Sequence, residues 1–266
     1  MSASLLAVDD LGLTYGIGEK AHVAIAGLEF AISTGEFVSI VGPSGAGKTT
    51  LLKCISGLLP PTSGEVRLSG QLVDRVPDRL AMVFQDYSRS LFPWLTVGGN
   101  VDLPLGRHGV SRQDRRQRVE ESLNAVGLAG FAERHPWQLS GGMQQRVAIA
   151  RALAYQPEIL LMDEPFASVD AQTRAELEDL VLAVRERFAM TILFVTHDID
   201  ESVYLADRVL VLSRSPARVV ADMGIALPHP RDQIETRERG DFVHLRGEVA
   251  RLIRAESRAG VSNALP

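Results

Sequence analysis

A glycine-rich stretch around residue 45 has the residue types and spacing of a phosphate-binding loop. It fits the pattern G-x-x-x-x-G-K-[ST] and lies between an apolar segment, residues 36–41, and a predicted helix. Its glycines let successive backbone N–H groups point at phosphate oxygens, and the helix N-terminus adds positive potential. Lys48 supplies a cation for the β- and γ-phosphates, and the Thr49 hydroxyl can ligate Mg²⁺. The residues predicted to bind the phosphates are Gly42, Pro43, Ser44, Gly45, Ala46, Gly47, Lys48, Thr49 and Thr50.

Two adjacent carboxylates, Asp163 and Glu164, follow a second apolar run, residues 159–162. Ligands of open α/β sheets bind at the carboxyl ends of the strands. Asp163 suits a hold on Mg²⁺ through water. If the strand continues, Glu164 points the opposite way, toward an attacking water, and it is the predicted general base. The alternative is a pair of solvated acids at a strand end, which the phosphate loop earlier in the chain makes the weaker interpretation.

A serine and two glycines at the start of a predicted helix form a second candidate anion site. Ser140, Gly141 and Gly142 offer a hydroxyl, bare backbone N–H groups and a helix dipole. They lie in the segment LSGGMQQR, which resembles the signature motif of the ABC ATPases, although Met143 stands where glutamine is usual. The order of the motifs also resembles that family over about residues 5–215. This order is the phosphate loop, Gln85, the signature, Asp163 with Glu164, and His197.

The resemblance implies roles for four further positions. Gln85 resembles the glutamine that ligates Mg²⁺ and senses the transporter, and His197 resembles the histidine that contacts the γ-phosphate. Asp170 lies in a segment that resembles the loop crossing the dimer, and Tyr15 resembles the aromatic residue that stacks on adenine. From chemistry alone, the alternatives are a polar loop residue, a structural histidine, a helix cap and a packing tyrosine, and Asp170 can serve both as a cap and in the crossing loop. The implied catalytic residues are Glu164, His197 and Lys48, and the implied Mg²⁺ ligands are Thr49, Gln85 and Asp163.

The same resemblance implies partners. Two ATP molecules lie between two head-to-tail subunits of a C₂ homodimer. Residues 85–97 and the tail segment 228–232 are similar to importer ATPases of the nitrate/sulfonate/taurine group, although from chemistry alone the aromatic residues of 85–97 are equally the core of a subdomain. In that group, a groove receives a short cytoplasmic helix of the membrane subunit. We therefore expect two integral membrane permease subunits, an external solute-binding protein acting indirectly, and a small anionic or heterocyclic solute.

The elements expected to position these residues alternate between strands and helices, which predicts an α/β fold with a mostly parallel sheet. Strands are predicted at 36–41, 80–84, 159–162, 192–195 and 208–212, and helices at 50–58, 112–126, 141–154 and 173–188. Residues 1–34 predict short, partly exposed strands, and 88–110 predict loops. By resemblance, this is a P-loop NTPase core with an antiparallel β subdomain and a helical insert. We expect an ABC ATPase domain at 1–215 with its insert at about 88–155, then a linker and helix at 216–266.

Composition limits the compartment and the partners. The net charge of −5 provides no global basic field for nucleic acid, so no nucleic-acid partner is expected. Cys54 is the single cysteine, which excludes an intrachain disulfide and favours a reducing compartment. Because no apolar run approaches the roughly 20 residues of a membrane span, and no signal peptide is visible, we expect a cytoplasmic protein on the inner face of the membrane.

Three alternatives remain open from the sequence. One is a non-transport ABC ATPase acting on nucleic acid or ribosomes, the second is an inactive regulatory module, and the third is an exporter ATPase. One cluster of basic residues on a predicted surface helix bears on the first, and we interpret it as a solvated face. This cluster consists of Arg112, Arg115, Arg116 and Arg118.

Overall fold

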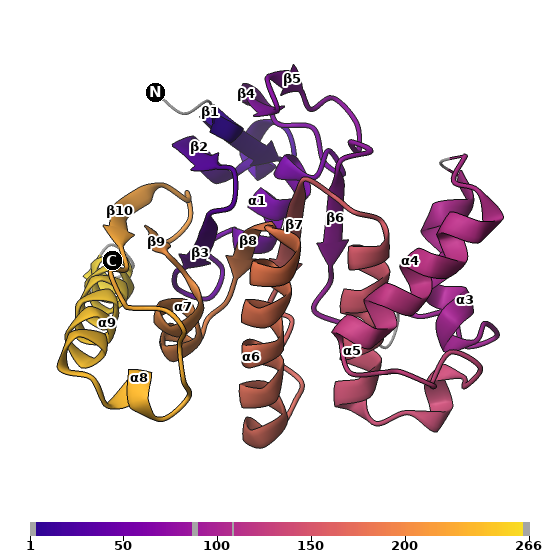
Figure 1. Ribbon diagram of the computed structural model, residues 1–266. Helices are drawn as coiled ribbons and strands as arrows, with labels where there is room; N and C mark the ends of the chain where they lie inside the picture. The colour runs from indigo at the N-terminus through magenta and orange to yellow at the C-terminus, as the bar shows by residue number, and fades with distance from the viewer. Residues whose placement is uncertain (1–3, 87–89, 108, 263–266) are drawn as a thin grey trace. The chain divides into compact units, whose positions relative to one another are not determined.

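Two long strands begin the chain and form an antiparallel sheet with two shorter ones in the order β2-β1-β4-β5 (Figure 1). The computed structural model describes residues 4–86, 90–107 and 109–262. The prediction of short strands is wrong in length, because β1 and β2 have 12 residues each. Gly12 does not interrupt β1: it lies where the neighbouring strand approaches, and a Cβ there would be 2.3 Å from Ser63 Oγ. The four strands are β1 Ser4–Tyr15, β2 His22–Ser33, β4 Ser63–Leu68 and β5 Gln71–Leu72.

These strands belong to the first of two compact units, which comprises the chain up to Asp78 and from Thr191 onward. The unit also contains a parallel arrangement in which β3 pairs with β8 on one side and β9 on the other, while β10 runs antiparallel to β9. Every residue of β3 and β8 is buried, as expected for strands covered on both faces. The elements are β3 Phe37–Val41, α1 Lys48–Ile55, β8 Thr191–Val195, α7 Ile199–Leu205, β9 Arg208–Leu212, β10 Val219–Gly224, α8 Glu235–Glu238 and α9 Gly240–Ser262, with a 3₁₀ turn at Gly18–Lys20.

The second unit comprises Arg79–Met190 and combines a parallel pair of strands, β6 and β7, with a group of helices. The loops predicted at 88–110 are only partly correct, because a helix and a 3₁₀ turn lie there. The buried amide of Asn100 donates to the carbonyls of Phe92 and Thr96, and these hydrogen bonds stabilise a helix whose second and third residues are glycines. The elements are β6 Leu80–Val83, α3 Val97–Asp102, α4 Arg112–Ala125, α5 Gly141–Ala154, β7 Ile159–Asp163 and α6 Ala171–Phe188, with 3₁₀ turns at Leu103–Arg107 and Pro136–Gln138.

Most predicted boundaries agree with the structure to within two residues, and the exceptions have local causes. Helix α1 ends at Ile55, three residues before the predicted end at residue 58, because Gly57 in the left-handed conformation turns the chain there. Ser111 caps α4, since the Asp114 N–H donates to Ser111 Oγ at 3.1 Å. The basic cluster on this helix is not uniformly solvated, because Arg115 is paired with Asp102. Strand β10 and helix α7 are not predicted by the sequence patterns.

No helix within the described ranges has both the length and the apolar character that a bilayer-spanning segment requires. Cys54 lies inside the first unit on α1, and its burial raises the pKa of the thiol to about 11. At neutral pH this residue is therefore an uncharged packing residue and a poor nucleophile.

Candidate functional site

The phosphate loop follows β3 directly, and its backbone has the left-handed turns that its glycines permit. Gly45 and Gly47 have φ values of 77° and 81°. Lys48 is only 7% exposed, and its ammonium donates to the carbonyls of Gly42 and Pro43 at 3.0 and 3.2 Å. The loop thus folds around a cation that it holds with its own backbone, next to the N-terminus of α1. Such an arrangement suits a polyanion such as a nucleotide phosphate chain.

Tyr15 and His197 belong to the same unit as the phosphate loop. The Tyr15 hydroxyl lies 3.1 Å from Thr50 Oγ1 on α1, while 42% of the residue is exposed, so its ring is accessible to a flat ligand. His197 is exposed and follows β8. Strands β3 and β8 pair in parallel with Ile40 opposite Val195, so His197 and the phosphate loop leave the sheet at the same edge. The sequence placed these groups in one site, and the structure brings them to one side of the first unit.

The acidic strand end and Gln85 lie in the second unit. Asp163 is the last residue of β7 and is 4% exposed. Glu164 adopts a left-handed backbone with φ 43°, which is strained for a residue other than glycine. The Gln85 amide donates to Glu164 Oε2 at 3.3 Å. The predicted orientation of Glu164 by strand alternation does not apply, because the strand ends one residue earlier and the turn aims the carboxylate toward Gln85.

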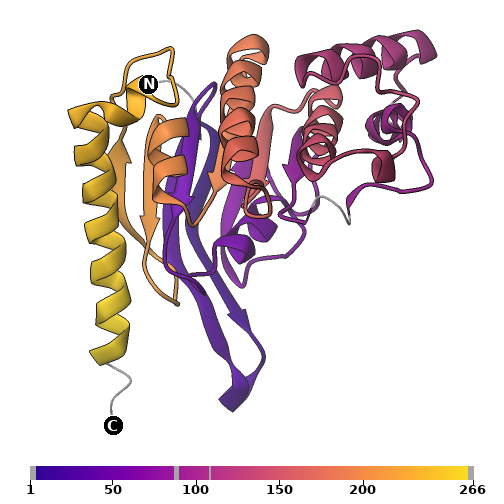
Figure 2. The same cartoon turned by 90° about the horizontal axis from the view of Figure 1, so that it is seen from below.

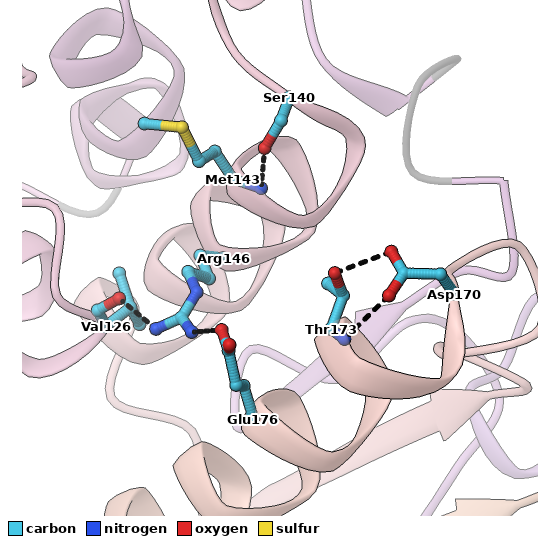
Figure 3. Close-up of polar contacts among 7 residues, drawn as sticks. All are labelled: Val126, Ser140, Met143, Arg146, Asp170, Thr173 and Glu176. Atoms are coloured by element: carbon cyan, nitrogen blue, oxygen red, sulfur yellow. Dashed lines mark hydrogen bonds and ion pairs between the residues drawn. The ribbon is translucent and has the colours of Figure 1, made fainter.

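The signature segment and Asp170 start two helices of the second unit, α5 and α6, as Figure 3 shows. Ser140 caps α5 by accepting from the Met143 N–H at 3.3 Å. Asp170 caps α6 by accepting from the N–H and the hydroxyl of Thr173 at 3.0 and 2.7 Å. These hydrogen bonds, the backbone one first, hold the pKa of the Asp170 carboxyl below its ordinary value. The interpretation of Asp170 as a helix cap is therefore confirmed, and its role in a loop that crosses the dimer stays a prediction.

Gly142 also has a packing role, because it lies against Thr173 of α6. A Cβ at this position would lie 2.5 Å from the Thr173 methyl carbon, Cγ2. Only glycine allows α5 and α6 to approach this closely at their N-terminal ends. Gly142 therefore sets how closely the neighbouring helix packs.

Arg146, the last residue of the signature segment, has a structural role in this region that its sequence pattern alone did not predict. Its guanidinium donates to the Val126 carbonyl at the end of α4 at 3.0 Å and to Glu176 Oε2 on α6 at 3.3 Å (Figure 3). Arg146 therefore connects the signature helix to two other helices. Its spacing of four residues from Gly142 places both on one helix face, which is the pattern that could have identified it.

The predicted Mg²⁺ ligands are a threonine hydroxyl, a glutamine amide and an aspartate carboxylate. These are hard oxygen donors, which fit Mg²⁺. Within the described part of the chain, no three side chains of His, Cys, Asp or Glu gather as a ready-made metal cluster. Thr49 belongs to the first unit, and Gln85 and Asp163 belong to the second. Each of the two units therefore carries part of the predicted ligand set.

Comparison with known proteins supports this chemistry. A family model described as ABC transporter matches residues 25–167, which is more than half of the chain. The nitrate import ATP-binding protein NrtD of Synechocystis sp. is 41% identical over 94% of this chain and 95% of its own length. The bicarbonate transport ATP-binding protein CmpC of Synechocystis sp. is 40% identical over 95% of this chain, but the chain spans only 38% of CmpC.

Solved structures agree with the fold. CbiO1 from Clostridium perfringens, part of the ABC transporter complex CbiONQ, has a TM-score of 0.77 at 27% identity and covers 98% of this chain and 99% of its own. The ATP-binding cassette MJ0796, solved as a dimer bound to ADP and Pi, has a TM-score of 0.71 at 36% identity, over 83% of this chain and 98% of its own.

The chain belongs to the ABC transporter family, and its fold is that of the ATP-binding cassettes of that family. The predicted fold class is confirmed: a P-loop NTPase core with a mostly parallel sheet, an antiparallel β subdomain and a helical insert. Within the family, the chain is similar to ATP-binding proteins of nitrate and bicarbonate transporters, which confirms the predicted likeness to the nitrate group.

Proposed function

We propose that this chain is the ATP-hydrolysing subunit of a membrane importer. The observation that carries the proposal is the pair formed by Gln85 and Glu164 at the ends of two parallel strands, next to the buried Asp163. A carboxylate that is only partly buried and is aimed by an amide suits a general base. Membership of the ABC transporter family is the reason for proposing that this hydrolysis is coupled to transport.

In the proposed reaction, Glu164 accepts a proton from the water that attacks the γ-phosphorus, and ADP leaves with the bond electrons. Lys48 and the N–H groups of the phosphate loop stabilise the charge on the phosphate oxygens, and His197 contacts the γ-phosphate. Tyr15 stacks on the adenine ring. Mg²⁺, held by Thr49, Gln85 and Asp163, supplies further charge neutralisation when bound.

We further propose a homodimer that closes around two ATP molecules, as the dimeric state of MJ0796 bound to ADP and Pi suggests. Ser140, Gly141 and Gly142 then bind the ATP held by the partner subunit. Ser140 Oγ already accepts a hydrogen bond from its own helix, so its O–H hydrogen is the group that donates to a phosphate oxygen. Asp170 lies at the crossing between subunits while it caps α6.

The partner that couples hydrolysis to transport is proposed to dock on the second unit. A groove of about 690 Å³ there is lined mainly by apolar and aromatic side chains, among them Trp94, which is 70% exposed. An aromatic groove of this kind suits an amphipathic helix, here a short cytoplasmic helix of the permease. The segment 85–97 was predicted to form this contact, and its residues 87–89 lie outside the described part of the chain. Side chains lining the groove include Met82, Phe92, Leu95, Leu103 and Tyr155.

The proposed importer has two integral permease subunits and receives its solute from an external binding protein, with this chain on the inner face of the membrane. The relatives favour a small anion such as nitrate or bicarbonate. Sulfonates and taurine share that anionic chemistry. The solute does not touch this chain in the proposed architecture, so its identity has to be determined by a growth experiment.

The decisive biochemical test compares the purified chain with Glu164→Gln. We expect hydrolysis to fall by about 10²- to 10⁴-fold while ATP binding and ATP-dependent dimerisation persist, because only the base is removed. Glu158→Gln is the matched control: it is also an acid of the second unit but is paired with Arg79, and its turnover should not change. Undiminished hydrolysis by Glu164→Gln would remove this residue as the base.

The transport proposal is tested by growth of a deletion strain on nitrate, bicarbonate, taurine or an alkanesulfonate as the sole source of the respective nutrient. Failure on one source, restored by the intact gene but not by Lys48→Ala, identifies the solute and ties its uptake to ATP. Normal growth on all four sources would contradict the proposed solute class. The ATPase proposal would then be tested only by the hydrolysis assay on the purified protein.

A further inference from the structure

The tail segment Pro-His-Pro-Arg-Asp, residues 228–232, has no part in the proposed reaction, yet it makes specific contacts in the first unit. Arg231 is only 9% exposed, and its Nη1 donates to the Tyr204 carbonyl at 2.5 Å. Tyr204 lies in the last turn of α7, where carbonyls have no partner within the helix. A guanidinium at this end also suits the helix dipole. Arg231 therefore caps the C-terminal end of α7.

The rest of the tail contacts the same short helix. The Arg237 guanidinium lies 4.8 Å from the centroid of the Tyr204 ring, and Arg246 Nη1 lies 3.3 Å from Asp200 Oδ1 in the first turn of α7. Helix α9 packs against α7 and β9 and runs beside these elements in both views (Figure 1, Figure 2). Its residues Phe242 and Val249 are buried. The tail thus holds α7 at both of its ends.

The first turn of α7 is tied to the two residues that flank His197. Asp198 Oδ1 accepts from the N–H groups of Asp200 and Glu201 at 2.9 and 3.2 Å. The buried Thr196 hydroxyl donates to Glu201 Oε2 at 2.6 Å and accepts from the Asp198 N–H at 3.0 Å. A change in the position of α7 must therefore move the loop that carries His197.

We infer that the tail is a positioning element for His197, and that Arg231 acts as a positioning residue through α7. This inference rests on the role of His197 in the proposed function. The carbonyl to which Arg231 donates belongs to α7 and not to the phosphate loop, so removal of Arg231 should disturb turnover and leave ATP binding intact. A merely structural residue would lower stability without acting through His197.

The test is a double-mutant cycle on the full chain with Arg231→Met and His197→Ala. Arg231→Met should lower kcat three- to tenfold with less than a twofold change in KM. Combined with His197→Ala, it should lower kcat no further. Arg231→Lys keeps one donor at the Tyr204 carbonyl and should retain most of the turnover. Thermal unfolding of each variant reports the folded fraction at the assay temperature.

Arg208→Met is the matched control, because Arg208 is also a partly buried arginine of the first unit but contacts Glu36 and Asp222 rather than α7. The Arg208→Met variant should be less stable, but its kcat should not fall. If Arg231→Met does not fold, Arg246→Met replaces it at the exposed end of α7 and should show a smaller effect with the same dependence on His197.

Equal losses of kcat in the presence and absence of His197 would overturn the inference, as would a loss explained entirely by the unfolded fraction. A different result would refute the proposed function of His197 itself: full kcat in His197→Ala alone, whatever the state of Arg231.

Discussion

The phosphate loop and the signature region both present backbone N–H groups at a helix start, but they are built differently. In the phosphate loop, the Lys48 ammonium donates to the carbonyls of Gly42 and Pro43, six and five residues away. In the signature region, α5 depends on Val126, Thr173 and Glu176, which come from two other helices. These hydrogen bonds of Lys48 are therefore local, whereas the contacts of the second site form only when three helices are packed together. Substitutions should separate chemistry from stability in the first and change both in the second.

The largest effect is expected from Lys48→Ala in the phosphate loop. Loss of the cation should lower hydrolysis by about 10²- to 10³-fold, as for removal of a single preorganised charge-stabilising group. Stability should change little, because the loss of hydrogen bonds such as those to Gly42 and Pro43 is offset by removal of a buried charge. Phosphate release and thermal unfolding measure the two quantities. A large loss of stability would show that this loop is not the local structure described here.

Gly142→Ala should lower both quantities in the signature region. The added methyl would lie 2.5 Å from Thr173 Cγ2, and such overpacking costs about 1–3 kcal/mol of unfolding free energy. Displacement of α5 should reduce hydrolysis at the same time. Thr173→Ser removes the clashing methyl and keeps the hydroxyl that donates to Asp170, so the double variant should recover most of the stability. If it recovers none, the contact with Thr173 is not the cause.

A smaller effect is expected at Arg146. Arg146→Met removes donors to the Val126 carbonyl and to Glu176, which should lower the unfolding free energy by about 1–2 kcal/mol. Glu176→Gln weakens only the ion pair between Arg146 and Glu176, whose carboxylate side chain is 55% exposed. The unfolding free energy should therefore fall by less than about 1 kcal/mol. Denaturant titration distinguishes the two. Equal costs would show that the ion pair, rather than the backbone carbonyl, anchors α5.

The smallest effect is a pH dependence at the cap of α6. Hydrogen bonds from Thr173 hold the pKa of Asp170 below its ordinary 3.8. Because the folded-state pKa is the lower one, the stabilisation by this carboxylate is fully present above the unfolded value and is lost as the pH falls through the folded value. The stability difference between the natural chain and Asp170→Asn should be constant from pH 8 to about pH 5 and shrink below pH 4. A difference that grows on acidification would contradict this assignment.

Much of the fold and of the candidate site was predictable because it depends on local patterns. Helix α5 has the predicted bounds, and β7 and β9 were placed to within one residue, since burial periodicity and apolar runs set them. The positions of Lys48 and Asp163 follow from the phosphate-loop spacing and from a strand end. The fold of α3 was not predictable, because two glycines at its start are compensated only by the buried amide of Asn100.

By itself, the amino-acid sequence determined the family, the phosphate loop and the order of the motifs, because hydrogen bonds within a few residues and short apolar runs are written in neighbouring positions. The tertiary structure alone decided the left-handed turn that aims Glu164 at Gln85, the close approach of Gly142 to Thr173, and the hold of Arg231 on α7. Each of these depends on atoms brought together from distant parts of the chain. No local pattern specifies such contacts, because their geometry follows from how the helices and strands pack.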